Sequence, residues 1–371
     1  MDFDAAVIGA GVIGLATARA LALRGASVLV LEAEDAIGTG ISSRNSGVIH
    51  AGLYYPTGSA KARLCVAGRR ALYRYAAERG VPHERTGKLV VATDEAQRPA
   101  LEDLLRQARA NGVEGIRALS AAEIRELEPE VRAVAGLFSA ETGIIDAHAL
   151  MLALQGDLEA AGGWVVPRTP LSRARRIAGG FELETGGDEP GRVTAGRLVN
   201  AAGLAASEVA ACIEGVPPES IPGTRYAIGH YYAWSGPLPF RHLVYPLPEP
   251  GGLGIHLVLD PGGGGRFGPD VRWIERPDHA FDDSRRDAFV DAIRRWWPGL
   301  DPERLHPDYT GIRPKLGEGS DFAILGPLEH GIPGYIGLHG IESPGLTAAL
   351  ALADRVAELL DSPVETRRTR N

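Results

Sequence analysis

Cysteine is scarce in this sequence, and its scarcity narrows the classes of protein that fit. The 371 residues contain two cysteines, Cys65 and Cys212, which lie far apart and in no spacing typical of metal ligands. A disulfide scaffold and a structural zinc site are therefore excluded as the basis of the fold. Cys65 falls in a predicted helix, where its simplest interpretation is a small buried residue.

The sequence also lacks basic residues before its first apolar segment, and it lacks a long apolar segment elsewhere. Residues 5–31 are apolar, but Asp2 and Asp4 precede them without any Lys or Arg, which is the wrong charge for an export signal. No other stretch reaches the roughly 18 apolar residues of a membrane-spanning helix. The net charge of −8 predicts no general attraction to nucleic acid or anionic lipid. We therefore expect a cytoplasmic protein, with peripheral contact to the inner membrane left open.

The sequence is rich in glycine and long enough for more than one domain. Its 48 glycines exceed average usage and suit a chain with many turns and close backbone approaches. The hydrophobic share of 44% and the charged share of 23% are ordinary for a globular protein. A chain of 371 residues is long enough for two domains, each with a core of its own.

The first 32 residues contain the strongest motif. An apolar strand over residues 5–8 leads into Gly9-Ala10-Gly11-Val12-Ile13-Gly14, then a helix over residues 12–23, a strand over residues 27–31, and Glu32. In a dinucleotide site the three glycines give a tight turn, a close approach to pyrophosphate and close helix packing. The helix N-terminus attracts phosphate, and Glu32 accepts from ribose hydroxyls. The alternative is a glycine-rich turn that binds nothing.

Two further segments favour a longer cofactor that carries a flavin ring. A second loop of glycine and small polar residues follows at residues 38–47, which a NAD site rarely needs; the alternative is a polar surface loop. Near the C-terminus, a strand over residues 335–340 leads into a helix over residues 346–360, with Ser343 as cap and Pro344 in the first turn. This second helix N-terminus can stabilise the negative charge of a reduced flavin.

The rest of the chain contains one part with predicted helices and strands and another part with short β-type runs. Helices are predicted over residues 61–80, 97–111 and 147–161, and strands over residues 87–93, 164–166, 181–185 and 193–203. Short β-type runs at residues 226–232, 253–259 and 267–269 predict an antiparallel sheet. Because no helix follows the glycines of residues 261–265, this run is interpreted as a hairpin turn.

The sequence resembles the FAD-dependent amino-acid and hydroxy-acid oxidoreductases of the D-amino-acid oxidase type. Within them it is most similar to the L-2-hydroxyglutarate dehydrogenase/oxidase group. The resemblance covers nearly the whole chain and is carried by residues 45–55, 61–68, 254–257, 268–269 and 311–315. This sequence has Asp270 where that group has Asn, and the residues of its turn at 339–344 also differ from those of the group.

The resemblance implies FAD and an α/β fold (α+β overall): a Rossmann-like FAD-binding domain of the glutathione-reductase type with a second, mainly antiparallel-sheet substrate domain. We expect the first domain at residues 1–84, 141–215 and 315–371, and the second at residues 85–140 and 216–314. The expected cofactor-binding residues come from the glycine loops, two strands and the C-terminal turn: Gly9, Gly11, Val12, Ile13, Gly14, Glu32, Ala33, Ser42, Ser43, Arg44, Asn45, Ser46, Val165, Ala201, Gly203, Gly340, Ile341, Ser343, Pro344, Gly345, Leu346 and Thr347. No metal is expected.

The predicted reaction is oxidation of a 2-hydroxy acid, with L-2-hydroxyglutarate as the first candidate. Arg313 offers a bidentate fork for the carboxylate, and His50 or His256 fits the base. Lys315 or Arg44 would meet a second carboxylate, and Tyr55 and Tyr245 would be pocket walls. A structural salt bridge for Arg313 and structural roles for the histidines are the alternatives.

Three functional questions stay open at this stage. The competing enzyme is an amine or amino-acid oxidase of the glycine or sarcosine type, and the non-enzyme alternative is a flavin-binding sensor or assembly partner. The electron acceptor is oxygen, a quinone or a carrier flavoprotein. The oligomeric state and a covalent link to the flavin are not predicted.

Overall fold

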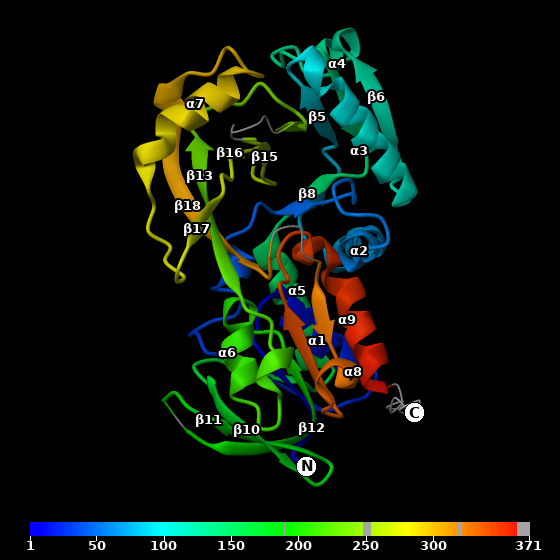
Figure 1. Ribbon diagram of the computed structural model, residues 1–371, viewed down its shortest axis with the longest axis vertical. Coiled ribbons are helices and arrows are strands. Elements are labelled where there is room, and N and C mark those ends of the chain that lie inside the picture. The colour runs from blue at the N-terminus through cyan, green and yellow to red at the C-terminus, as the bar shows by residue number, and fades with distance from the viewer. Residues whose placement is uncertain (189, 248–253, 318–320, 362–371) are drawn as a thin grey trace. The chain divides into compact units, whose positions relative to one another are not determined.

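The computed structural model describes residues 1–188, 190–247, 254–317 and 321–361. Backbone contacts divide the chain into two units, drawn with their elements in Figure 1. Unit 1 comprises Met1–Ser43, Ala147–Tyr226 and Arg313–Asn371, and unit 2 comprises Arg44–Asp146 and Ala227–Ile312. Residues 44–84, which the sequence groups with the nucleotide-binding segments, pack in unit 2, because β3 (Val48–Ile49) and β4 (His83–Glu84) both pair with β8 (Gly143–Ile145).

Unit 1 is built on a sheet with a parallel centre. Its strand order is β10 (Leu171–Ile177), β11 (Gly180–Thr185), β12 (Arg192–Asn200), β1 (Phe3–Ile8), β2 (Val28–Leu31) and β9 (Trp164–Val166). β20 (Tyr335–His339) joins β12, and β19 (Ala323–Leu325) joins β20. Neighbours of β1 run parallel to it, whereas β10, β11 and β19 are attached antiparallel. The carboxyl ends of β1, β2 and β12 therefore meet at one edge of the sheet.

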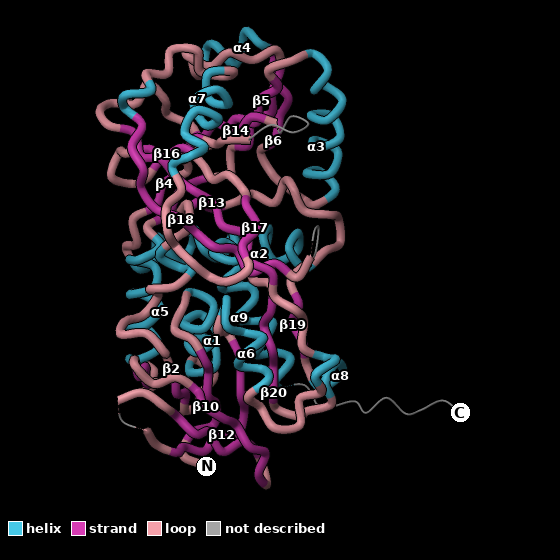
Figure 2. Tube along the Cα trace, turned by 60° about the vertical axis from the view of Figure 1, so that its left-hand side comes forward, coloured by secondary structure: helices cyan, strands magenta, loops and turns pink. Residues whose placement is uncertain are grey.

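Three helices lie together against this sheet. α1 (Val12–Ala22) packs between α5 (Ala147–Ala160) and α9 (Gly345–Asp361), and the three lie side by side in both views (Figure 1; Figure 2). α1 is buried almost all round, as a helix enclosed by neighbours must be. Short α6 (Ala206–Ala211) contacts β12 and β20, and α8 (Pro327–His330) contacts β19.

Unit 2 contains a larger, mostly antiparallel sheet. Its order is β17 (Arg272–Ile274), β13 (Arg225–Trp234), β16 (Gly265–Phe267), β15 (Leu257–Leu259), β14 (Leu243–Pro246), β5 (Lys88–Ala92), β7 (Ala135–Ser139) and β6 (Ile116–Ser120), with β18 (Leu305–Lys315) paired to β13. The pair β14–β5 is parallel. This register fixes which side chains of the two segments share a face, since Leu243 lies opposite Lys88 and Tyr245 opposite Val90.

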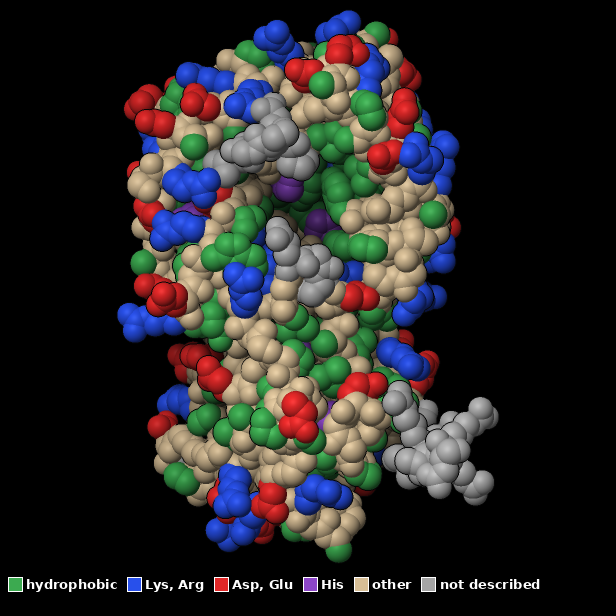
Figure 3. Space-filling view, in the orientation of Figure 1, with side chains coloured by type: hydrophobic (Ala, Val, Ile, Leu, Met, Phe, Trp, Pro, Cys, Tyr) green, Lys and Arg blue, Asp and Glu red, His purple; other side chains and the backbone are tan. Residues whose placement is uncertain are grey.

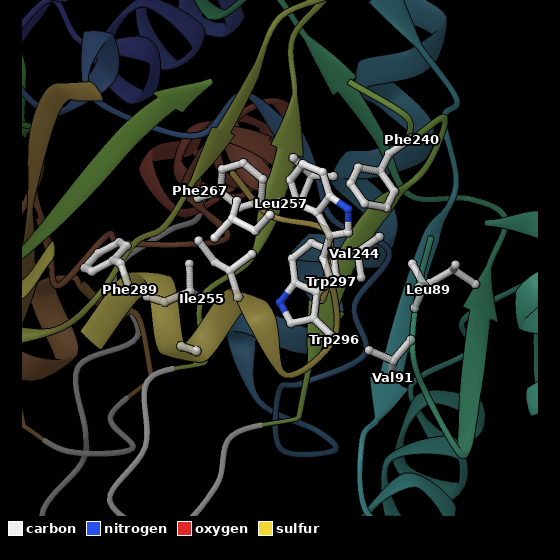
Figure 4. Close-up of a cluster of buried hydrophobic side chains, with 14 of the residues drawn as sticks. Leu89, Val91, Phe240, Val244, Ile255, Leu257, Phe267, Phe289, Trp296 and Trp297 are labelled. Carbon is white, nitrogen blue, oxygen red and sulfur yellow. The ribbon is translucent and has the colours of Figure 1, made fainter. Parts of the chain in front are cut away.

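The helices of unit 2 are α2 (Ala60–Arg79), α3 (Arg98–Ala110), α4 (Ala121–Leu127) and α7 (Arg286–Arg294). One face of the sheet carries an aromatic core in which Trp296 and Trp297 pack with Phe240 and Phe267 (Figure 4). Burying several large rings removes much apolar surface from water, which stabilises the unit without a disulfide.

The structure corrects several predicted boundaries. α9 begins at Gly345, so Pro344 precedes the helix instead of lying in its first turn. The run predicted at residues 253–259 is a strand only over Leu257–Leu259, and Leu253 lies outside the described residues. The run predicted at residues 267–269 ends as a strand at Phe267, before Pro269, which cannot donate to a ladder. The glycine run at residues 261–265 connects the antiparallel strands β15 and β16, as predicted.

Across the described residues, no helix is both long and apolar enough to cross a membrane. On the face shown in Figure 3, basic and acidic side chains are interspersed.

Candidate functional site

The first glycine turn of unit 1 has geometry that only glycine allows. Gly9 has a φ of 101°, and a Cβ there would lie 2.8 Å from the carbonyl oxygen of Ala201. A Cβ on Gly14 would lie 1.9 Å from the carbonyl oxygen of Gly9, so the helix is in direct contact with the turn. The turn therefore brings bare backbone to the N-terminus of α1, where the first N–H groups have no acceptors within the helix.

Two polar side chains hold this turn in place. Glu32 Oε2 accepts a 2.6 Å hydrogen bond from the Ala10 N–H, and Oε1 accepts from the Glu34 N–H at 3.0 Å. Ser42 Oγ accepts from the Val12 N–H at 3.0 Å. A carboxylate has about four acceptor positions, so Glu32 keeps capacity for ribose hydroxyl groups.

The second helix N-terminus predicted from the sequence lies beside the first. The Cβ position of Gly345 is 3.9 Å from Ile13 Cδ1, which joins the starts of α9 and α1. Gly340, with a φ of 66°, allows the chain to turn between β20 and α9. Two positive dipole ends therefore lie close together in unit 1, which suits an anionic, extended cofactor.

The predicted cofactor residues divide between the units. Those in unit 1 are Gly9, Gly11, Val12, Ile13, Gly14, Glu32, Ala33, Ser42, Ser43, Val165, Ala201, Gly203, Gly340, Ile341, Ser343, Pro344, Gly345, Leu346 and Thr347, whereas Arg44, Asn45 and Ser46 belong to unit 2. In unit 2 the carbonyl of Asn45 accepts from the Tyr309 hydroxyl at 2.7 Å, and its side chain accepts from the Gly47 N–H at 2.7 Å. These contacts fix the start of the segment that carries His50.

His50 follows β3 and is half-buried. Burial, and secondarily the charge of Lys88, lower the pKa of His50 to about 3. The imidazole is therefore neutral near physiological pH, and burial disfavours its protonated form. The Cys65 thiol donates a hydrogen bond to the His50 carbonyl with a sulfur–oxygen distance of 3.4 Å. This contact gives the buried cysteine a structural partner, consistent with its predicted interpretation.

His256 and Tyr245 form a stacked pair. Their ring centroids are 3.7 Å apart and their planes differ by 5°. Lys88 places its Nζ 4.5 Å from the centre of the same tyrosine ring and 4.6 Å from the centre of the Tyr54 ring. Of the predicted groups, His50, His256, Tyr55 and Tyr245 thus belong to unit 2, and the last of these shares a cluster with a lysine that was not predicted.

The end of α3 holds the segment that contains both tyrosines of the His50 loop. The Asn111 side-chain amide donates to the carbonyls of Gly52 and Tyr55 at 3.0 and 2.8 Å, and the Gln107 amide donates to the Leu53 carbonyl at 2.9 Å. These three hydrogen bonds from side chains to backbone carbonyl groups hold the loop in a defined conformation.

Arg313 and Lys315 both lie in β18 but differ in their surroundings. Lys315 Nζ lies 2.9 Å from Glu342 Oε1, and that carboxylate is buried. The lysine charge is therefore already paired, which argues against the predicted second-carboxylate role. Arg313 is half-buried, and its candidate role in binding a carboxylate stays a prediction.

Asp270, a position at which the sequence was expected to differ from the related group, is directed into unit 2. Its carboxylate accepts from the backbone N–H of His230 at 2.7 Å and pairs with Arg285 at 2.9 Å. Burial favours the neutral acid, but hydrogen bonds from His230 outweigh it and hold the pKa of Asp270 below its usual value. The departure is thus accommodated by partners inside the unit.

Sequence reasoning missed Lys88. A signal was available, because this lysine opens the otherwise apolar strand Lys88-Leu89-Val90-Val91-Ala92. Every residue of that strand is buried, and a lysine is rarely fully buried unless it has a partner or a function.

Taken together, the glycine turn, the acid after β2 and the paired helix N-termini define the class: a flavoprotein with a Rossmann-like nucleotide unit and an antiparallel-sheet unit. The chain belongs to the family described as FAD dependent oxidoreductase, whose model matches residues 4–359. It is an FAD-dependent oxidoreductase, and FAD is its cofactor. The residues of unit 1 fit this group, since Cβ atoms would close the glycine turn and Glu32 retains free acceptor capacity.

Relatives and solved structures agree with this assignment. The chain is 40% identical to the mitochondrial L-2-hydroxyglutarate dehydrogenase of Arabidopsis thaliana, over 95% of this chain and 82% of that protein. It is 30% identical to the L-2-hydroxyglutarate dehydrogenase of Indibacter alkaliphilus, over 97% and 90%. L-α-glycerophosphate oxidase from Mycoplasma pneumoniae with FAD bound has a TM-score of 0.88 and 25% identity, covering 97% and 95% of the chains. Glycine oxidase from Geobacillus kaustophilus, with a TM-score of 0.82, 23% identity and coverage of 96% and 94%, shares the fold.

Proposed function

We propose that this enzyme oxidises a 2-hydroxy acid to the 2-oxo acid and that L-2-hydroxyglutarate is its substrate. The observation that carries this proposal is the 40% identity, over 95% of the chain, to a protein named for that substrate. The two histidines His50 and His256 are consistent with it, because alcohol oxidation needs a group that accepts the hydroxyl proton.

His50 and His256 are the two candidates for this proton acceptor. His50 is held neutral by burial and by a neighbouring cation. His256 is oriented by its stacking on Tyr245, which restricts rotation of the imidazole ring. The substrate hydroxyl gives its proton to one of these rings while its carbon loses a hydride. When bound, FAD supplies the acceptor for that hydride.

Arg313 is proposed to bind the carboxylate next to the oxidised carbon. A guanidinium matches a carboxylate with two parallel hydrogen bonds, which fixes orientation as well as affinity. Its half-buried position in β18 reduces competition from water. Tyr55 and Tyr245 are proposed as walls that keep the substrate away from bulk water.

The cofactor assignment by residue is also part of the proposal. We assign the nucleotide to unit 1, whereas the proposed substrate residues are His50, His256, Tyr55 and Tyr245 from unit 2 and Arg313 from unit 1. Gly9 to Gly14 would receive the pyrophosphate, Glu32 the ribose, and the turn at Gly340 to Thr347 the flavin end. Ala33, Ser42, Ser43, Val165, Ala201 and Gly203 would line the remainder, together with Arg44, Asn45 and Ser46 from the start of unit 2.

The competing proposal is an amino-acid or amine oxidase, which the shared fold with glycine oxidase favours. Such a substrate also needs a cation for its carboxylate, but its neutral amine needs no strong base. A flavin-binding protein without turnover is the third possibility. The electron acceptor (oxygen, a quinone or a carrier flavoprotein) and a cytoplasmic location stay predictions.

The test is an absorbance experiment under nitrogen with purified holoenzyme. L-2-hydroxyglutarate should bleach the flavin band, whereas D-2-hydroxyglutarate and L-glutamate should not. Bleaching by L-glutamate or glycine in place of the hydroxy acid would establish the competing oxidase. A flavin that no small acid reduces would leave a protein that binds flavin without turnover.

A further inference from the structure

Lys88 is a fully buried lysine whose ammonium group has no anionic partner in the part of the chain that the structure describes. The residue is 0% exposed, and its Nζ has no hydrogen-bond partner among the described residues. It lies on the same face of the sheet as Tyr245, because Leu243 is opposite Lys88 in the β14–β5 register and successive side chains alternate. Its surroundings include the rings of Tyr54 and Tyr245, and its charge also acts on His50 and Cys65.

The rings of Tyr54 and Tyr245 form two walls around the Lys88 ammonium. A parallel imidazole 3.7 Å from Tyr245 covers one face of that ring, so the Lys88 ammonium lies over the opposite face. Tyr54 forms the other wall and is 37% exposed, whereas Tyr245 is 4% exposed. Of the two rings, Tyr54 is therefore the one that a ligand would displace to reach Nζ.

Among the described neighbours of Lys88, neither Cys65 nor Tyr245 supplies a negative charge. Burial raises the pKa of the Cys65 thiol to about 12, and burial raises the pKa of Tyr245 well above its ordinary value. Both groups are neutral at physiological pH. Burial lowers the pKa of Lys88 itself to about 7. Cation–π contacts offset part of the desolvation of an ammonium but leave its hydrogen-bonding capacity unused.

We propose that Lys88 is a substrate-binding residue that determines specificity by taking the carboxylate remote from the oxidised carbon. This inference rests on the proposed function, because it concerns a substrate with two carboxylates. It follows from the Lys88 ammonium, which has no partner among the described residues, and from the pairing of Lys315, one of the two cations predicted for that carboxylate, with Glu342. The incoming carboxylate displaces the partly exposed Tyr54 ring and makes a charge-assisted hydrogen bond to Nζ.

Steady-state kinetics with two matched substrates test this role. L-2-hydroxyglutarate carries the remote carboxylate, and L-2-hydroxypentanoate carries a methyl group in its place. Lys88→Met should lower kcat/KM for the first by about 10² to 10³-fold, mainly through KM, and change the second less than about threefold. Lys88→Arg keeps the charge and should retain part of the preference. Equal losses for both substrates, or unchanged values for the first, would overturn the inference.

A matched control uses a second cation on a tyrosine ring. Arg85 lies 4.3 Å above the centre of the Tyr73 ring in the same unit, but its side chain is 55% exposed and paired with Glu141. Arg85→Met should leave both substrates unchanged. A loss of the diacid preference in this variant would show that the effect of Lys88→Met is not specific.

A binding measurement separates this inference from the proposed function. Glutarate has both carboxylates but no hydroxyl group, so its binding requires no turnover. Glutarate should raise the Tm of the wild-type holoenzyme and not that of Lys88→Met, whereas pentanoate should have equal small effects on both. If the wild type does not oxidise L-2-hydroxyglutarate but shows this glutarate effect, only the proposed function fails. If glutarate has no effect on the wild type, the role of Lys88 fails.

Discussion

Glu32, the acid that follows β2, accepts a 2.6 Å hydrogen bond from the backbone N–H of Ala10 in the first glycine turn. The bond fixes the acid beside the segment predicted to hold FAD. Glu32→Ala should weaken FAD binding by about tenfold to 10²-fold, since hydrogen bonds to a charged group contribute about 1.5–3 kcal/mol. Flavin fluorescence titration of the apoprotein measures the Kd. Glu34→Ala is the matched control, because only the backbone N–H of Glu34 contacts Glu32. An equal Kd for Glu32→Ala and wild type would contradict the assignment.

Two glycines in helices should respond in opposite ways to alanine. In Gly14→Ala the new Cβ would lie 1.9 Å from the Gly9 carbonyl oxygen, so we expect a loss of about 1–3 kcal/mol or more in unfolding free energy. In Gly156→Ala no atom lies within 4 Å of the new Cβ, and the helix α5 should gain up to about 1 kcal/mol. Denaturant unfolding of both variants compares them, and a stable Gly14→Ala protein would show that the turn adjusts easily.

Replacing the proton acceptor should slow turnover without removing the cofactor. The variant of the true base, His50→Gln or His256→Gln, should lose about 10² to 10⁴-fold in kcat. The other should lose much less, since it only shapes the pocket. Stopped-flow flavin reduction measures the step directly, with the flavin content of each variant as control. Losses below tenfold in both variants would assign the proton to another group.

Arg313→Ala should raise KM steeply for every 2-hydroxy acid while FAD stays bound. The reason is that the guanidinium is proposed to bind the carboxylate that all such substrates share. Arg313→Lys should be intermediate, because an ammonium keeps the charge but loses the fork. Initial rates over a wide substrate range give KM, and an unchanged KM in Arg313→Ala would leave the arginine with a structural role.

The stability of the protein should carry a pH signature from Lys88. Burial lowers the pKa of Lys88 from 10.5 to about 7, so between these values the unfolded chain binds one proton more than the folded chain. The unfolding free energy therefore rises with pH across this window, and below about pH 7 the cost of the buried charge is constant. Lys88→Met should be more stable than wild type at pH 7, with a difference that shrinks as pH approaches 10.5. Denaturant unfolding without ligand at several pH values measures this, and a difference independent of pH would contradict it.

Local motifs were predictable from the sequence, whereas contacts between distant segments were not. The turn from Gly9 to Gly14 and the acid at position 32 follow from short-range spacing, because one strand, one turn and one helix contain them. The lysine at the start of an apolar strand was a local signal, but the surroundings of Lys88 depend on the register between β5 and β14, which no local pattern specifies. The pairing of Lys315 with Glu342 likewise arises only when the chain returns through β20.

The predicted domain boundary also differs from the boundary between the two units, because neighbouring residues were assigned together. Ser42 and Arg44 are neighbours in a single polar loop, so the sequence assigns both to the cofactor. In the structure the first contacts the start of α1, and the second begins the other unit. The polar composition of the loop does not specify which unit each residue joins. The pairing of β3 with β8 places the later residues of the loop in unit 2.

The parallel pairing of β5 with β14 has a consequence for synthesis on the ribosome. β5 and its antiparallel neighbour β7 emerge early, whereas β14 is made much later and completes the other side of β5. Until then the nascent chain presents an apolar strand with one free edge, a form that invites association with other chains. A polypeptide that stops before Leu243 should therefore accumulate in aggregates, and chaperone demand should be greatest while the intervening segment is being translated.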